Sequence, residues 1–366
     1  MSKVKLGDVA IEHKETCKGS KDGYPILGLE HLVPEEVTLT AWDEGGDNTF
    51  TKMFRKGNVL FGRRRAYLKK AAVAPFDGIC SGDITVIEAI PDRILPELLP
   101  FIIQNDELFD FAVGKSAGSL SPRVKWEHLK NYEFELPDMD KQRELAELLW
   151  AMDATKKAYQ KLIAATDELV KSQFIEWFGT ADRHPKNVEY VRLGDLATYV
   201  NGFAFKPDDW GEHGLPIIRI QNLTGTNEVY NYYDGEYPKQ FEVNDGDVLI
   251  SWSASIGVYL WRQGKAILNQ HIFKVVFDKK PIDKDFFMCA VAQKLEEMGT
   301  KTHGATMKHI VKKDFDNTVI AYPEQAVQQQ FAAFVRQSDK SKFVALRCSN
   351  LNLSLCSESP RTARMQ

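Results

Sequence analysis

The amino-acid sequence predicts an α+β protein. Two similar mixed α/β domains are expected in tandem, separated by two long helices packed as an antiparallel coiled coil, with pseudo-two-fold symmetry. Three observations predict this architecture: the two halves of the chain resemble each other, each half begins with short apolar runs, and each half ends with a heptad pattern. The expected boundaries are 1–138 for the first domain, 139–180 for the first helix, 181–323 for the second domain, 324–350 for the second helix and 351–366 for a disordered tail.

The internal repeat is the most informative feature. Residues 4–10, VKLGDVA, resemble residues 191–197, VRLGDLA, at an offset of 187. Later in each half, identical or similar residues keep one offset of 186 over about 40 positions, which indicates duplicated domains rather than a solenoid of short repeats. These pairs are Lys115 with Lys301, Gly118 with Gly304, Leu129 with Phe315, Asn131 with Asn317, Pro137 with Pro323, Gln142 with Gln328, Ala146 with Ala332 and Asp153 with Asp339.

The first part of each half is predicted to be a mixed sheet with one helix. Gly, Pro, Asp and Asn interrupt the apolar runs, as they do between short strands. Amphipathic patterns predict helices over 96–113 and 283–298, each followed by a glycine. The strand-like runs are 59–61, 84–87, 248–252 and 273–277.

The second part of each half is predicted to be a long helix. From Asp140 to about Phe178 the apolar or small positions alternate in spacing between four and three, which is a heptad seam. At about 1.5 Å per residue, a 40-residue helix spans roughly 60 Å and can hold two domains apart. An oligomerisation or core element is the alternative interpretation. The predicted helix-interface residues are Leu145, Leu149, Met152, Tyr159, Ile163, Val170, Phe331 and Val335.

Composition indicates an ordinary globular protein of 366 residues, 43% hydrophobic and 27% charged. The five cysteines are scattered, so neither a disulfide framework nor a zinc site is predicted. No apolar run is long enough to cross a membrane and no signal-peptide pattern is present, so a cytoplasmic location is expected. The net charge of −4 argues mildly against DNA binding, unless basic residues cluster or partners supply charge.

No catalytic residue and no metal site is predicted. Gly114-Lys115-Ser116 resembles the end of a phosphate-binding P-loop, but Phe109 stands where the first glycine is needed. No metal-spaced cluster of His and Cys is present, and no dinucleotide-binding glycine motif follows a strand. His271 lies beside an apolar run and is expected to be a hydrogen-bonded histidine at a strand end.

Two basic segments favour nucleic-acid binding. Residues 63–70, RRRAYLKK, follow a strand-like run, and arginine forks bond bidentately to guanine edges and phosphates. Residues 115–125 and their counterpart 301–313 combine glycine, hydroxyls and basic side chains, which suits phosphate contacts. A solvated charged loop is the alternative interpretation for each.

The two repeats differ in a loop where two domains that bind different DNA sequences need different side chains. Residues 63–70 align with 252–259, which are uncharged. The predicted DNA-binding residues are Arg63, Arg64, Arg65, Lys69, Lys115, Ser119, Ser121, Arg123 and Lys125 in the first half, and Trp252, Ser253, Gln270, Lys301, Thr306 and Lys308 in the second.

Several stretches resemble those of type I restriction-modification specificity subunits. They are 57–64, 67–73 and 78–82, together with 4–8, 118–119 leading into 129–131, and 136–137 leading into 142–143. The resemblance covers about residues 4–348 in the family order of recognition domain, helix, recognition domain, helix. Each motif is weakly specific, whereas the duplicated arrangement is much more so.

The resemblance implies that each globular part is a target recognition domain for double-stranded DNA with a split, asymmetric target. It implies that the helices fix the distance between half-sites and dock two modification (methyltransferase) subunits, which two restriction subunits then join. It places S-adenosylmethionine, ATP and Mg²⁺ on those partners and no cofactor on this non-catalytic chain. The short second helix departs from the family pattern. A specificity subunit without a nuclease partner and a coiled-coil scaffold that does not bind DNA are the alternatives.

Overall fold

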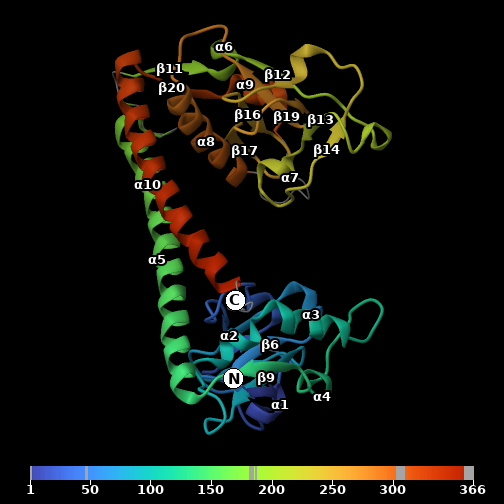
Figure 1. The fold of residues 1–366 in the computed structure, drawn as a ribbon. Helices are drawn as coiled ribbons and strands as arrows, with labels where there is room; N and C mark the ends of the chain where they lie inside the picture. Colours follow the sequence, from blue (N-terminus) through green and yellow to red (C-terminus); the bar gives the residue numbers. More distant parts are fainter. Residues whose placement is uncertain (1, 46–47, 181–184, 186–187, 302–309, 358–366) are drawn as a thin grey trace, which may run out of the picture. The chain divides into compact units, whose positions relative to one another are not determined.

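Two units of the same topology make up the chain in this computed structural model, one formed by residues 1–158 with 351–366 and the other by 159–350. The structure describes residues 2–45, 48–180, 185, 188–301 and 310–357, with the side chains of 299–301 and 344–357 outside that description. Figure 1 labels many of the elements of each unit.

The first unit contains two four-stranded sheets and a two-stranded ribbon. The strand order of the antiparallel sheet is β2 (Ala10–Glu12), β9 (Ile84–Ala89), β6 (Val59–Gly62), β7 (Ala71–Val73). The order of the mixed sheet is β4 (Asp43–Glu44), β3 (Pro25–Leu27), β8 (Gly78–Cys80), β5 (Lys52–Phe54), with β3 and β8 parallel. The ribbon pairs β1 (Ser2–Lys5) with β10 (Glu133–Leu136).

The second unit repeats all three pairings. Its antiparallel sheet has the order β12 (Thr198–Asn201), β19 (Ile272–Val276), β16 (Val248–Ser251), β17 (Gly257–Leu260). Its mixed sheet has the order β14 (Asn231–Tyr233), β13 (Leu215–Ile218), β18 (Ala266–Leu268), β15 (Glu242–Val243), and its ribbon pairs β11 (Glu189–Arg192) with β20 (Val319–Tyr322). The predicted tandem of similar mixed α/β domains is confirmed.

Short helices fill the connections between these strands. The α-helices of the first unit are α1 (Leu6–Val9), α2 (Leu99–Ile103), α3 (Asp106–Gly114) and α4 (Trp126–Leu129), and those of the second are α6 (Leu193–Leu196), α7 (Ile220–Leu223), α8 (Lys284–Lys301) and α9 (Lys312–Asn317). Single 3₁₀ turns lie at Leu29–His31, Ala66–Leu68, Pro207–Asp209 and Lys239–Phe241.

The single helix predicted over 96–113 is wrong, because the structure divides that segment into α2 and α3. Asn105 between them has extended backbone angles, and its side chain accepts a hydrogen bond from the backbone N–H of Glu107 at 2.8 Å. This is an N-cap, and it starts a new helix. The second predicted helix, over 283–298, corresponds to α8 and continues past Gly299.

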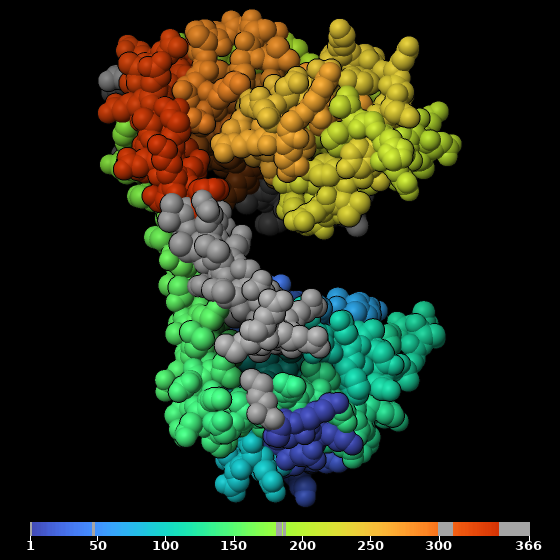
Figure 2. Space-filling view, viewed as in Figure 1, coloured from blue at the N-terminus to red at the C-terminus, as the bar shows by residue number. Residues whose placement is uncertain are grey.

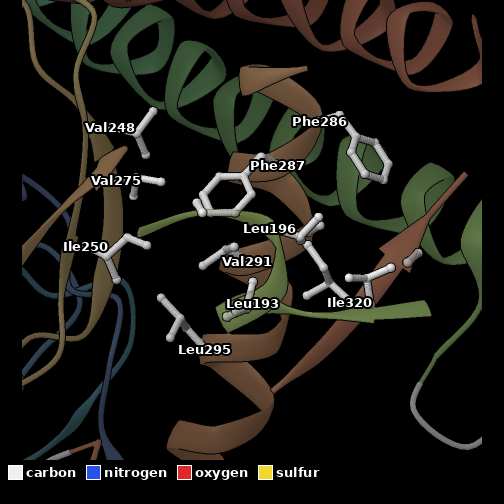
Figure 3. Packing of buried hydrophobic residues seen from close by; sticks show 14 of the residues in the cluster. Leu193, Leu196, Val248, Ile250, Val275, Phe286, Phe287, Val291, Leu295 and Ile320 are labelled. Carbon is white, nitrogen blue, oxygen red and sulfur yellow. The ribbon is translucent and has the colours of Figure 1, made fainter. Parts of the chain in front are cut away.

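The core of the second unit forms where α8 packs on the antiparallel sheet. Phe287, Val291 and Leu295 recur every four residues and therefore share one face of the helix. Figure 3 shows this face directed toward side chains of β16 and β19. The strand residues in that contact, Val248, Ile250 and Val275, are buried.

Two long helices follow the sheets. The first, α5, spans Met139–Phe178, and the second, α10, spans Gln325–Ser357. The second helix was predicted to end at 350. It continues because no glycine or proline occurs from 325 to 357 to end it.

Within the second unit, the end of α5 and the beginning of α10 pack antiparallel (Figure 1). The rings of Phe174 and Phe331 lie 5.5 Å apart, and the Lys342 ammonium lies 2.8 Å from the Asp167 carboxylate. The residue number falls along one helix as it rises along the other, which confirms the predicted antiparallel direction there. The pseudo-two-fold relation between the units stays a prediction.

A buried glutamine joins each long helix to its own unit. Gln142 is 2% exposed and Gln328 is 1% exposed. The Gln142 side chain accepts from the Leu95 backbone N–H (2.8 Å) and donates to the Pro137 carbonyl (2.9 Å). The second unit repeats both bonds, because Gln328 accepts from Asp283 N–H (3.0 Å) and donates to the Pro323 carbonyl (2.8 Å).

Replacing Gln142 with alanine is expected to lower the free energy of unfolding by about 1–3 kcal/mol, because the Leu95 N–H loses its partner in a buried place. Gln328→Ala is expected to act likewise on the second unit. Gln160→Ala, at an exposed position of α5, is the matched control and should change little. Urea unfolding followed by circular dichroism measures the difference. Equal effects at Gln142 and Gln160 would contradict a structural role for the buried amide.

Candidate nucleic-acid interface

The predicted basic segment 63–70 forms the connection from β6 to β7. Arg65 and Lys69 both have left-handed backbone angles, with φ of 54° and 50°, and flank the 3₁₀ turn Ala66–Leu68. The backbone N–H of Arg65 donates to the Pro122 carbonyl at 2.8 Å. The two basic segments of the first unit, 63–70 and 115–125, therefore lie against each other.

Three side chains from these segments, Arg64, Ser121 and Arg123, form what we call the arginine cluster together with Asp83, which lies in the turn between β8 and β9. The Arg123 guanidinium donates to both carboxylate oxygens of Asp83, from Nε at 2.7 Å and from Nη2 at 3.4 Å. Arg64 donates from Nη1 to the same carboxylate at 3.3 Å and from Nε to the Ser121 hydroxyl. Arg64 and Arg123 also form a β-bridge, so the backbone itself sets the two arginines side by side.

The electrostatics of the cluster favour a charged Asp83. The pKa of its carboxyl is lowered, chiefly by the hydrogen bonds from Arg123. Burial opposes this as the second-largest effect, and the charge of Arg123 and then the hydrogen bond and charge of Arg64 lower the pKa further. The ion pairs therefore stabilise the fold above the pKa of the unfolded chain, and this contribution is lost as the pH falls through the lowered pKa of Asp83. At neutral pH the cluster carries two positive charges and one negative charge.

Each arginine has N–H donors that no acceptor among the described residues binds. Among the described residues, Nη2 of Arg64 and Nη1 of Arg123 have no hydrogen-bond partner, and the side chains of Arg64 and Arg123 are 38% and 42% exposed. The connection between α3 and α4, which carries Ser121 and Arg123, reaches away from the sheets in Figure 1. The cluster is thus a preorganised pair of guanidinium groups open to a ligand.

The other predicted residues of the first unit lie around this cluster with different partners. The Lys69 ammonium pairs with the exposed carboxylate of Asp106 at 2.5 Å, and the Lys115 ammonium lies 5.8 Å from the centre of the Phe111 ring. Ser119 and Lys125 are exposed, and Nε of Arg63 is buried without a partner in the described part of the chain.

In the second unit, Trp252 occupies the place of Arg63. Its indole Nε1 donates to the Asn201 side chain at 3.1 Å, and its ring lies 4.8 Å from the His271 ring. The backbone hydrogen bonds are the same in both units. Arg63 N–H donates to Asp83 O (3.0 Å) and Val124 N–H to Arg63 O (2.9 Å), while Trp252 N–H donates to His271 O (3.2 Å) and Ile310 N–H to Trp252 O (2.9 Å).

The alignment of 63–70 with 252–259 needs a correction. Strand β17 begins at Gly257, so the loop of the second unit is 252–256 and Tyr259 lies in a strand. Ser253 and Gln270 are half-buried next to this loop. Thr306 and Lys308 lie outside the described residues, and so does the side chain of Lys301.

The sequence prediction missed the residues that hold these side chains in place. Asp83 was not among the predicted residues, and its place in the cluster follows from its contacts with Arg64 and Arg123 in space. The expectation that His271 is a hydrogen-bonded histidine is wrong for one ring nitrogen: Nδ1 is buried and has no partner among the described residues. The side-chain oxygen of Asn269, two residues earlier, is likewise buried and has no hydrogen-bond partner among the described residues.

The predicted helix-interface residues divide between the two units. Leu149 packs on the core of the first unit, and Val170, Phe331 and Val335 belong to the core cluster of the second. Leu145 is 39% exposed. The remaining three, Met152, Tyr159 and Ile163, are half-buried.

Neither a metal centre nor a membrane span is evident in the described residues. No three of their His, Cys, Asp and Glu side chains are grouped so as to hold a metal ion. None of the helices described is both long and apolar enough to cross a membrane.

Comparison with known proteins identifies the family. The sequence matches the type I restriction modification DNA specificity domain over residues 1–165 and again over residues 185–346. The chain belongs to this family. It contains two specificity domains in tandem, each with its own sheets and one long helix.

Individual relatives agree with the two specificity domains. The chain is 27% identical over 144 residues to the EcoBI specificity subunit of Escherichia coli, a match that covers 39% of this chain and 30% of that subunit. It is 21% identical over 371 residues to the putative MjaX specificity subunit of Methanocaldococcus jannaschii, covering 90% and 84%. The matches to the EcoBI subunit and to the MjaVIII specificity subunit of Methanocaldococcus jannaschii span only about a third of those relatives, 30% and 37% of their length.

A solved structure shows the same fold. The S subunit of a type I restriction-modification system from M. genitalium superposes with a TM-score of 0.53 at 12% identity, covering 97% of this chain and 95% of that one. At this level of identity the likeness concerns the fold.

The titration of Asp83 tests the geometry of the arginine cluster. Its carboxyl is expected to titrate below the usual aspartate range, and Arg123→Gln is expected to raise its pKa more than Arg64→Gln, because Arg123 makes the larger contribution. Carboxyl ¹³C chemical shifts against pH, in protein labelled at aspartate, measure all three. An ordinary pKa in the unsubstituted protein would show that the ion pairs do not form in solution.

Proposed function

We propose that this chain is the DNA sequence-specificity subunit of a type I restriction-modification complex. It binds a bipartite, asymmetric duplex target, with one half-site for each specificity domain. It directs partner methyltransferase and restriction subunits to that target and carries no catalytic centre. The observation that carries the proposal is one backbone framework that presents an arginine loop in the first domain and an uncharged aromatic loop in the second.

Local charge supports DNA binding in spite of the net charge of −4. Segments 63–70 and 115–125 hold eight basic residues and no acidic one, and a hydrogen bond between their backbones joins them. A positive surface of this kind attracts the phosphate backbone, and arginine forks reach base edges in the major groove. Two domains that address one face of a duplex read half-sites about one helical turn, or about 34 Å, apart.

The first long helix supports the docking of partner proteins. Leu148, Leu162 and Leu169 are 57%, 50% and 49% exposed and lie at multiples of seven residues, so they share one helix face. Figure 2 shows α5, in green, at the molecular surface. We propose that this face docks two modification subunits, which the restriction subunits join. These partners bind S-adenosylmethionine, ATP and Mg²⁺, and the assembly acts in the cytoplasm.

Deleting the gene is expected to abolish methylation at one bipartite motif, because no other chain would direct the methyltransferase there. Long-read sequencing of modified bases in the host, with and without the gene, measures this. Complementation with the unsubstituted gene is the control. Unchanged methylation at every motif would contradict the proposal. A chain that also binds duplex DNA only weakly, and loses it at moderate salt, would instead be a scaffold that assembles proteins.

Replacing Arg64 with alanine is expected to cost about 1–3 kcal/mol of binding and to relax the preference at one base pair. Arg93→Ala, an exposed arginine beyond the other end of β9, is the matched control for charge. Fluorescence anisotropy with duplexes that carry every single-base change of the motif measures both. A uniform loss over all duplexes would make Arg64 a phosphate contact.

A further inference from the structure

Among the described residues, Asp83 is the one carboxylate that contacts the two arginines of the cluster. It lies in the turn between β8 and β9, and its backbone carbonyl accepts from Arg63 N–H at 3.0 Å. Its side chain is 21% exposed, so the carboxylate lies beneath the two guanidinium groups and is less accessible than either. Its position is therefore fixed by the sheet rather than by a flexible loop.

This carboxylate has a cost that a phosphate-binding site would avoid. A negative charge next to two arginines opposes the approach of phosphate oxygens. An arginine that binds phosphate as a charge needs no such neighbour. An arginine that reads a base needs a fixed plane and direction, because both hydrogen bonds of the fork have to meet their acceptors together.

The observed bonds supply that fixed direction. Asp83 binds Nε and Nη2 of Arg123, the side edge of the guanidinium, and leaves the Nη1 end directed elsewhere. Arg64 is held at Nη1 by Asp83 and at Nε by Ser121, which leaves Nη2. Two like charges are thereby kept close together with free donors. Among the base edges in the major groove, guanine offers two acceptors and no donor.

We propose that Asp83 is the positioning residue that makes the arginine cluster a reader of guanine in the half-site of the first specificity domain. This inference rests on the proposed function. It assigns base selection to a residue that touches no DNA: Arg64 and Arg123 contact the base, and Asp83 sets their orientation.

The second domain supports the assignment by its difference. His271 occupies the position of Asp83, with the same backbone bond to the residue that follows the central strand. The Asp83 carboxylate contacts Arg64 and Arg123, whereas the His271 ring contacts the aromatic ring of Trp252, with 4.8 Å between the ring centres. The carboxylate thus occurs together with arginines, and the described counterparts in the other domain have neither: His271 stands for Asp83, and residues 252–256 are uncharged. A carboxylate needed only for the fold would be expected in both.

The substitution Asp83→Asn separates the selection of a base from the general electrostatic attraction of DNA. The full-length chain, purified with the subunits that accompany it, is tested on duplexes carrying the methylated motif and each single-base substitution of it. The substituted protein is expected to lose about tenfold of its preference for guanine at one base pair. Binding to duplexes without the motif is expected to be unchanged or tighter, because a negative charge has been removed.

Asp77→Asn is the matched control. Asp77 also pairs with an arginine, Arg55, at 2.8 Å, and lies next to the opposite end of β8. The substitution Asp77→Asn removes the same charge and one ion pair, and it is expected to leave every base preference intact. Arg123→Lys is the second variant, because it keeps the positive charge and removes the fork. It is expected to lose the same guanine preference as Asp83→Asn.

The outcomes distinguish the inference from the function it rests on. Unsubstituted protein that prefers no motif over scrambled duplex overturns the proposed function itself. Unsubstituted protein that discriminates, with Asp83→Asn discriminating equally well, overturns only the role of Asp83. A uniform loss of binding over all duplexes, accompanied by a lower melting temperature, also overturns it and makes Asp83 a residue of the fold. If Asp83→Asn does not fold, retained guanine preference in Arg123→Lys overturns the inference.

Discussion

The hydrogen bonds of a buried glutamine hold each long helix to its own domain. Gln142 and Gln328 each connect the start of a helix to the segment that leaves the antiparallel sheet, and each also binds the proline carbonyl five residues earlier. A buried amide has to satisfy its donors and its acceptor, so only one orientation of the helix start meets both partners. The start of each long helix therefore has a fixed orientation relative to the segment that leaves the antiparallel sheet.

The duplicated framework separates what is constant from what varies. Backbone bonds fix the residue after β6 and its counterpart after β16 in the same way, although one residue is Arg63 and the other is Trp252. A backbone N–H and C=O are available on both residue types, so these bonds do not depend on the side chain. The surrounding loops differ in length and charge, and the strands beneath them pair in the same order.

Periodicity allowed much of the architecture to be predicted from the sequence. The heptad seam and the constant offset between repeats depend on long-range order, so the two similar domains and the presence of two long helices were predicted, although the second helix ends later than expected. The hydrogen bond of a single side chain cannot be recognised from periodicity in the same way. The side chain of Asn105 starts a new helix inside a segment whose amphipathic pattern predicts one continuous helix. The basic residues of the candidate site were recognisable by composition. Asp83 was not, because its role depends on two arginines that the fold brings to it from positions 19 and 40 residues away.

The backbone bonds around the loop after β6 have a consequence for how such a protein changes over generations. Since they anchor the loop without its side chains, a substitution there is expected to change the recognition that we propose for this surface with little effect on folding. New preferences can accordingly arise by single mutations that the folded state tolerates. A half-buried carboxylate such as Asp83 is the exception, because its charge and its arginines have to change together. Sequence changes between two uncharged loops thus accumulate easily, whereas the gain or loss of a charged loop is slow because several residues have to change together.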